Sequence, residues 1–159
     1  MSENMRERPK DFVNTGRLLI RLFRKFEEEI VASLSRRGFS DVTLANLSVL
    51  RHLDLDGLRI TTLAEDAGVT KQAVGQMIVE LESKGYVKKR RDPNDRRAKL
   101  VTYTERGMEL IKTAQAIVSE IEVSYRQELG SKSYEALRHG LKTLLEASDD
   151  SPMVQTPDH

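Results

Sequence analysis

The sequence predicts a mainly α protein of the α+β type, in which long N- and C-terminal helices flank a compact central unit. Apolar residues recur every three or four positions near both ends of the chain, as they do on one face of a helix. Between these ends, two runs with strand-like composition flank the turn sequence Asp92-Pro93-Asn94-Asp95. A chain of 159 residues can bury one sizeable core, so we expect a single domain over residues 10–147.

The N-terminal part of the chain predicts two helices and an edge strand. Residues 1–9 are polar and charged and are expected to form a flexible arm. One long amphipathic helix is predicted from about Asp11 to Arg37, and its apolar stripe consists of Leu19, Phe23, Phe26, Ile30 and Leu34. Thr43 can cap the next helix, a core helix of about three turns that carries leucines 44, 47, 50 and 53. Residues 58–60 are expected to form an edge strand beside the later strands.

Two short helices joined by a tight turn are predicted next. Thr62 and Glu65 have the spacing of a capping box, which predicts that the first helix begins at Thr62. Gly68 then permits the tight turn between two crossed helices. Thr70 is a natural N-cap for a second helix from about Lys71 to Lys84, and the chain leaves this helix at Gly85.

The second of these helices has an unusual polar face. At 100° per residue, Val74, Met77, Ile78 and Leu81 lie on the inner face, with Ala73 at its margin. The outer face has uncharged hydrogen-bonding groups and a glycine where a solvated face would carry Lys and Glu. Glutamine can pair with adenine, and an aliphatic side chain can pack on a thymine methyl. A poor surface helix with a misplaced glycine is the alternative. The candidate DNA-binding residues of this helix are Thr70, Lys71, Gln72, Gly75, Gln76 and Val79.

A basic hairpin is predicted after this helix. Residues 86–91 and 98–103 read as strands, joined by a basic loop. Residues 84–99 carry eight basic and two acidic residues, a net charge of +6 in a chain whose formal net charge is +1. Such a dense cluster of like charges usually binds a polyanion; a solvated turn is the alternative. With the two helices, the hairpin makes a winged helix-turn-helix over residues 43–103. Its candidate DNA-binding residues are Lys88, Lys89, Arg90, Arg91, Asp95, Arg96 and Arg97.

Two helices are predicted after the hairpin. Thr104 begins a long helix whose stripe runs from Leu110 to Tyr125, and Gly130 ends it. Ser131 is a candidate cap for the last helix, and residues 148–159 are expected to form a disordered tail. These stripes exceed what a small central unit can cover, so we expect the helices of residues 10–37 and 104–147 to form a dimer interface.

Composition excludes several classes of protein. The chain has no cysteine, which rules out disulfides, thiolate zinc sites and thiol redox switches. Its three histidines lie in no spacing that suggests catalysis or metal binding, and no phosphate-binding glycine loop is present. We therefore expect no enzymatic activity, no cofactor and no metal. No apolar run approaches the length of a membrane span, so the cytoplasm is the expected compartment.

The central stretch resembles the MarR family of transcriptional regulators. The resemblance rests on Leu63-Ala64, on residues 92–97 (Asp-Pro-Asn-Asp-Arg-Arg) and on Tyr103-Thr104-Glu105-Arg106-Gly107, where the family has Leu-Thr-x-x-Gly. Tyr103 departs from that pattern.

This resemblance implies a cytoplasmic homodimer that binds double-stranded DNA at an inverted repeat and acts as a repressor. Asp95 and Arg97 match the Asp-x-Arg of the family's wing, which implies that the acid orients the arginine into the minor groove; the resemblance does not decide whether Arg96 or Arg97 lies deepest there. A small aromatic or anionic effector is a further partner that it implies. A winged-helix module that binds protein rather than DNA is the alternative.

Overall fold

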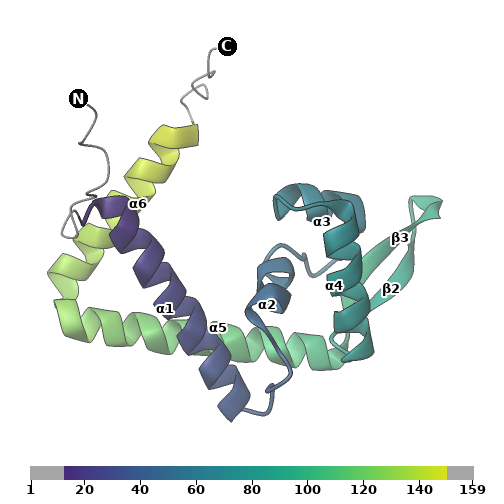
Figure 1. Cartoon of the computed structure of the whole chain (residues 1–159), viewed down its shortest axis with the longest axis horizontal. Helices are drawn as coiled ribbons and strands as arrows, with labels where there is room; N and C mark the ends of the chain where they lie inside the picture. The colour runs from purple at the N-terminus through teal and green to yellow at the C-terminus, as the bar shows by residue number, and fades with distance from the viewer. Residues whose placement is uncertain (1–12, 150–159) are drawn as a thin grey trace, which may run out of the picture. The chain divides into compact units, whose positions relative to one another are not determined.

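The computed structural model describes residues 13–149 (Figure 1). The expected N-terminal arm, residues 1–9, lies outside this part of the chain. The elements are α1 (Thr15–Arg36), α2 (Leu44–Leu50), β1 (Leu58–Arg59), α3 (Ile60–Asp66), α4 (Lys71–Ser83), β2 (Val87–Asp92), β3 (Asp95–Tyr103), α5 (Glu105–Leu129) and α6 (Ser131–Asp149). They form two compact units that divide between Ile117 and Val118. No helix within residues 13–149 has the length and apolar character needed to span a membrane.

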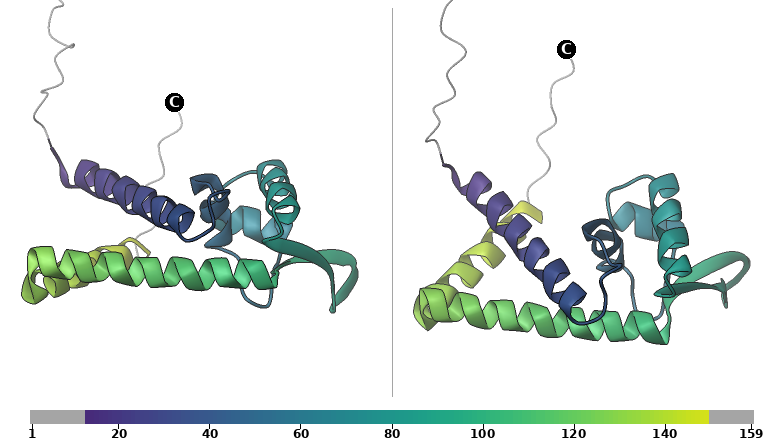
Figure 2. Two further views of the ribbon diagram at one scale, coloured as in Figure 1. Left: turned by 90° about the horizontal axis from the view of Figure 1, so that it is seen from below. Right: turned by 60° about the horizontal axis from the view of Figure 1, so that its bottom comes forward.

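The first unit contains a small antiparallel sheet with the strand order β1-β3-β2. Leu58 and Arg59 of β1 pair with Val101 and Leu100 of β3, so the predicted edge strand is confirmed for residues 58–59, whereas Ile60 begins α3. A helical chain with one small sheet also confirms the predicted fold class, and α3, α4 and the β2–β3 hairpin follow one another as a winged helix-turn-helix (Figures 1 and 2).

The hairpin turn is tighter than predicted. Only Pro93 and Asn94 lie between the strands, and the side chain of Asp92 accepts a hydrogen bond from the backbone N–H of Asn94 at 2.8 Å. Such a bond from an aspartate to the residue two positions on is typical of a turn. The basic residues Arg96 and Arg97 therefore belong to β3, and the predicted basic loop between the strands is wrong.

The start of α3 also differs from the prediction. The helix begins at Ile60, and its N-cap is Arg59, which has an extended backbone and makes no side-chain capping bond. The capping box of Thr62 and Glu65 is therefore wrong, because Thr62 already lies inside the helix. The physical reason is that β1 pairs with β3 up to Arg59, and the chain enters α3 directly from that strand.

Two other helices are shorter than predicted. Helix α1 begins at Thr15 rather than near Asp11, because Asn14 is extended and its side chain accepts a hydrogen bond from the Arg17 N–H at 2.8 Å. Thr43 caps α2 as predicted, in a capping box with Asn46. However, α2 ends at Leu50, and its first residue, Leu44, is 40% exposed and does not belong to the core.

The core of the first unit joins the helices to the sheet. Its fully buried side chains include Leu34, Leu50, Leu63, Val74, Ile78, Leu81, Tyr86, Val101 and Leu110. Tyr103 ties β3 to the end of α2, since its hydroxyl donates to the backbone oxygens of Leu50 at 2.7 Å and Leu53 at 3.1 Å. Burial raises the pKa of Tyr103 to about 12. The departure from leucine at this position thus adds a buried polar link without disturbing the fold.

The second unit contains the end of α5 and all of α6. Gly130 has φ +76° and separates the two helices, as predicted. Its carbonyl accepts the Tyr134 N–H, so Gly130 rather than Ser131 holds the N-cap position of α6. Tyr134 is buried, with Arg126 and Arg138 lying 5.0 and 5.8 Å from its ring centre. Helix α6 runs to Asp149, past the predicted start of the tail at residue 148, and the rest of that tail lies outside the described residues.

Candidate nucleic-acid interface

Helix α4 is fixed in the first unit by its apolar face. The Thr70 hydroxyl accepts a hydrogen bond from the Ala73 N–H at 3.2 Å, which confirms Thr70 as the N-cap. Val74, Ile78 and Leu81 have no exposed surface. Each fully buried aliphatic side chain of this size stabilises the fold by roughly 1.5–3 kcal/mol, so these three contacts hold α4 firmly.

The opposite face of α4 presents the predicted candidates to solvent. Thr70, Lys71, Gln72 and Gln76 are exposed, Gly75 is half-buried, and Val79 is 59% exposed. An alanine side chain at Gly75 would meet no atom within 4 Å beyond the adjacent residues and the local helix backbone, so packing within the chain does not require a glycine there. All six residues are thus accessible from solvent; Gln72, Gln76 and Val79 lie on the open face of α4, with Gly75 at its margin, whereas Thr70 and Lys71 lie at the N-terminal end of the helix.

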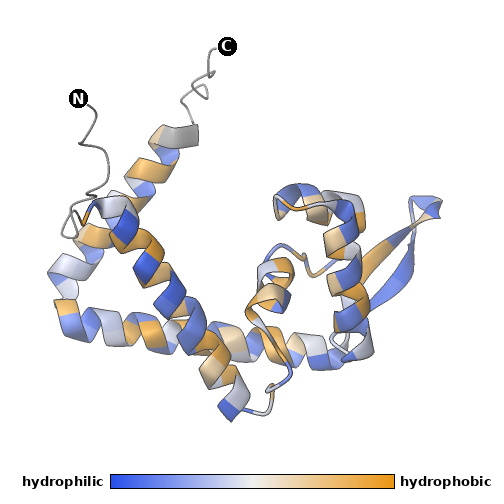
Figure 3. Ribbon diagram, viewed as in Figure 1, coloured by the Kyte–Doolittle hydropathy of each residue, from blue (hydrophilic) through white to orange (hydrophobic). Residues whose placement is uncertain are grey.

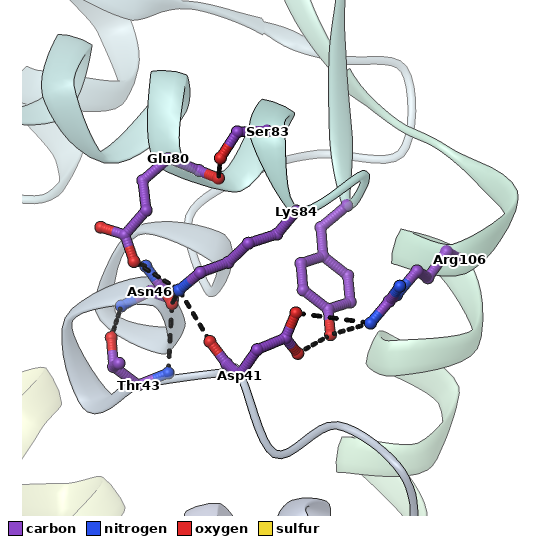
Figure 4. A network of polar contacts seen from close by, with 8 residues as sticks. Asp41, Thr43, Asn46, Glu80, Ser83, Lys84 and Arg106 are labelled. Carbon is purple, nitrogen blue, oxygen red and sulfur yellow. Dashed lines mark hydrogen bonds and ion pairs between the residues drawn. The ribbon is translucent and has the colours of Figure 1, made fainter.

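A polar network fixes the C-terminal end of α4 (Figure 4). The Lys84 ammonium donates to the Asp41 carbonyl at 2.7 Å and to the side-chain oxygen of Asn46 at 3.1 Å, and it also binds Glu80. Asn46, which is fully buried at the start of α2, donates to Glu80 at 3.3 Å. The hydrogen bond from Lys84, followed by that from Asn46, lowers the pKa of Glu80. Helix α4 is thereby tied to the beginning of α2.

The same network extends to α5. The Tyr86 hydroxyl donates to Asp41 at 2.5 Å, and Arg106 donates to the same hydroxyl at 3.1 Å, with its guanidinium 4.8 Å from the centre of the Tyr86 ring. The Tyr86 hydrogen bond is the main cause of the lowered pKa of Asp41. Sequence reasoning did not identify this group, because Asp41 lies 45 residues from Tyr86 and 65 from Arg106, and no local pattern links them.

The strand register sorts the basic residues of the hairpin onto two faces. Val87 pairs with Tyr103, Lys89 with Val101 and Arg91 with Lys99, and directly paired residues point to the same side of a sheet. Val87 and Val101 are buried, and Lys89 binds Glu82 of α4 at 2.8 Å. Lys89, Arg91 and Lys99 therefore lie on the α4 side of the sheet, whereas Lys88 and Arg90 lie on the other side. The outer hairpin is hydrophilic, as Figure 3 shows.

These cations also differ in their partners. Lys89 is neutralised by Glu82, and Arg90 donates to the Asp56 carbonyl at 2.7 Å. Neither Arg91 nor Arg97 forms an ion pair with any described residue, and both are exposed. Arg91 is thus the exposed, unpaired cation nearest to the hairpin turn on the α4 side of β2.

A bulge lies at the outer end of the hairpin. Arg91 pairs with Lys99, but the next residue, Asp92, pairs with Asp95, so residues 96–98 lie between the two pairs without partners on β2. A bulge of this kind changes the direction of the side chains on the bulged strand. Arg97 belongs to the bulge, as does Arg96, whose side chain lies outside the described part of the structure.

Asp95 does not contact the guanidinium of Arg97. One of its carboxylate oxygens accepts the backbone N–H of Arg97 at 3.0 Å, and the other lies 3.6 Å from Arg59 Nη2. Arg59 also donates twice to one oxygen of Asp92, at 2.8 and 2.6 Å. Sequence reasoning missed Arg59, since only the pairing of β1 with β3 brings it beside the hairpin turn. Within residues 13–149, no three acidic or histidine side chains cluster as a metal site would require.

Two crossed helices followed by a basic β-hairpin define the winged helix-turn-helix class of DNA-binding proteins. The model of the MarR family matches residues 40–98. The chain is 32% identical to an uncharacterized HTH-type transcriptional regulator of Mycobacterium leprae, over 74% of this chain and 82% of that protein. It is 36% identical to an HTH-type transcriptional repressor of Mycobacterium tuberculosis, over 65% of this chain and 73% of that protein.

Solved structures agree with these relatives. The reduced form of MarR from Escherichia coli matches with a TM-score of 0.73 and 25% identity, over 85% of this chain and 98% of that chain. The chain therefore belongs to the MarR family of transcriptional regulators.

Proposed function

We propose that this protein is a cytoplasmic, homodimeric repressor that binds an inverted-repeat operator through the outer face of α4 and the outer part of the hairpin. The observation that carries the proposal is the arrangement of two surfaces. The open face of α4 has uncharged hydrogen-bonding groups. The cations Arg91 and Lys99 lie on the hairpin, on the face of the sheet that is directed toward α4. Uncharged groups suit base edges in the major groove, whereas cations suit phosphates and a narrow minor groove.

Exposed apolar side chains support the homodimer. In the stripe of α1, Ile30 and Leu34 are buried, but Leu19 and Phe23, further toward the N-terminus, are 41% and 48% exposed. Leu18, Ile20 and Leu22 are exposed beside them. Because monomeric proteins rarely leave such a large apolar patch in water, we infer that a second copy of the chain covers it.

Two finer parts of the proposal rest on the family. The M. tuberculosis relative is named a repressor, which supports repression rather than activation here. Release from DNA by a small aromatic or anionic ligand rests on the resemblance alone. Selection of duplexes from a random pool tests the proposal as a whole, since a regulator of this kind should enrich a two-fold symmetric sequence. A module that binds only protein should enrich none.

Gly75→Ala is expected to make the protein more stable and weaken its binding to the selected duplex. Alanine is favoured over glycine in a helix interior by roughly 0.8–1 kcal/mol, and the added methyl meets no atom within 4 Å apart from the local backbone of α4 and the adjacent residues. On DNA, however, the methyl would stand between α4 and the groove, so we expect about a tenfold loss of affinity. Thermal unfolding and fluorescence anisotropy measure the two effects.

Gly140→Ala in α6 is the matched control, since it also adds a methyl in open space within a helix. It should raise stability, and where sedimentation shows that its dimer is intact, its DNA affinity should equal that of the wild type. If Gly75→Ala bound the selected duplex as tightly as the wild type, α4 would not approach DNA at this position.

A further inference from the structure

Arg59 links β1 to both ends of the hairpin turn. Its guanidinium donates to Asp92 from Nε at 2.8 Å and from Nη2 at 2.6 Å, and Nη2 lies 3.6 Å from Asp95. Asp92 is 6% exposed and is the one buried charged residue among those that the structure describes. A buried carboxylate is costly unless it is paired and hydrogen-bonded, so Asp92 depends on these partners.

Each of the two acids uses its second oxygen to hold the backbone of the hairpin. Asp92 accepts the Asn94 N–H at 2.8 Å, and Asp95 accepts the Arg97 N–H at 3.0 Å. The Asn94 N–H and then Arg59 lower the pKa of Asp92, so both contacts favour the charged form of its carboxylate. One arginine thus connects, through two carboxylates, to the turn and to the bulge of residues 96–98.

The position of Arg59 in the chain gives this linkage a consequence beyond stability. Arg59 is both a residue of β1 and the N-cap of α3, the first helix of the helix-turn-helix. Asp92 and Asp95 pair directly across the hairpin, where like charges repel unless a cation lies between them. Arg59 therefore compensates two negative charges beside Arg91 and Arg97 and fixes the outer hairpin to the start of α3.

We propose that Arg59 is a positioning residue that, through Asp92 and Asp95, holds the bulge of residues 96–98 in the orientation in which Arg97 enters the minor groove. This inference rests on the proposed function. It differs from the expectation that Asp95 orients an arginine side chain, because the contacts run through the backbone of the bulge and originate at β1. Arg59 acts here without contacting DNA.

Arg59→Ala, with Arg90→Ala as its control, tests the proposal. Both arginines flank Leu100 in the strand register and lie on the sheet face opposite α4, and both substitutions remove one positive charge. Arg59→Ala is expected to weaken binding to the selected duplex about tenfold more than Arg90→Ala does. Hydroxyl-radical footprints, which report on sugars exposed in the minor groove, should lose the protection by the hairpin, while protection of guanine N7 from dimethyl sulfate by α4 in the major groove persists. A purely structural defect would weaken both protections together and overturn the proposal.

Asp95→Asn is a second variant for the case in which Arg59→Ala lowers the stability of the folded protein. It retains an oxygen that can accept the Arg97 N–H and removes only the charge that faces Arg59. Charge counting predicts tighter DNA binding for this variant, whereas the proposal predicts weaker binding and a weaker minor-groove footprint. Tighter binding of Asp95→Asn, or equal effects of Arg59→Ala and Arg90→Ala, would overturn the role of Arg59. If the wild type itself showed no sequence preference, the proposed function would fail first.

Discussion

Gly107→Ala is expected to prevent stable folding. An alanine Cβ at this position would lie 2.0 Å from the Tyr86 carbonyl oxygen and 3.1 Å from the Tyr103 ring. Neither neighbour can move freely, because Tyr86 is fully buried and its carbonyl accepts the Thr104 N–H at 3.1 Å. We expect a loss of about 4 kcal/mol or more in the free energy of unfolding, the range reached by severe core substitutions.

Circular dichroism during heating and urea titration measures this loss. Gly140→Ala, which adds a methyl without any neighbour within 4 Å, serves as the control and should be slightly more stable than the wild type. A Gly107→Ala protein that melted within a few degrees of the wild type would contradict the close approach of α5 to Tyr86. The same approach explains physically why the Tyr-Thr-x-x-Gly sequence ends in glycine.

Leu19→Asp is expected to dissociate the dimer and thereby abolish tight operator binding. Leu19 is 41% exposed in a single chain, so aspartate at this position leaves the core of the first unit intact. In a dimer, the charge would lie in an apolar interface. Because two linked half-site contacts gain about a hundredfold or more over one, we expect at least that loss of affinity for the symmetric duplex.

Sedimentation velocity and anisotropy measure the two consequences of Leu19→Asp. The wild type should sediment at about twice the chain mass of 18.1 kDa, and the variant at the chain mass. Arg21→Ala, on the polar side of α1, should leave the dimer intact. A Leu19→Asp variant that remained a dimer would exclude this face as the interface.

Local sequence patterns predicted the helix-turn-helix well. Thr70 and Gly85 bound α4 through backbone conformations that depend on those residues themselves, and the spacing of Val74, Ile78 and Leu81 defines its buried face. For the same reason, the outward direction of the candidate residues on α4 agrees with the structure.

Features that depend on tertiary pairing could not be predicted in this way. Helix α3 begins at Ile60 rather than at the predicted Thr62, because β1 pairs with β3 up to Arg59 and this pairing outweighs the local capping pattern. It also brought Arg59 to Asp92, 33 residues away. Arg90 and Arg91 lie on opposite faces of the sheet because of the register between β2 and β3, which cannot be read from the composition of the strands.

The salt dependence of DNA binding by Arg91→Ala and Arg90→Ala tests most directly whether the α4 side of the hairpin contacts DNA. The two arginines are neighbours on opposite faces of β2. Each substitution removes one positive charge, so the two variants have the same net charge and differ only in which face loses it. For Arg91→Ala, we predict that the slope of log affinity against log salt falls in magnitude by about one, the change expected for one lost phosphate contact. For Arg90→Ala, the slope should remain that of the wild type. Equal slopes for the two variants, or a smaller slope only for Arg90→Ala, would contradict the assignment of this face to DNA.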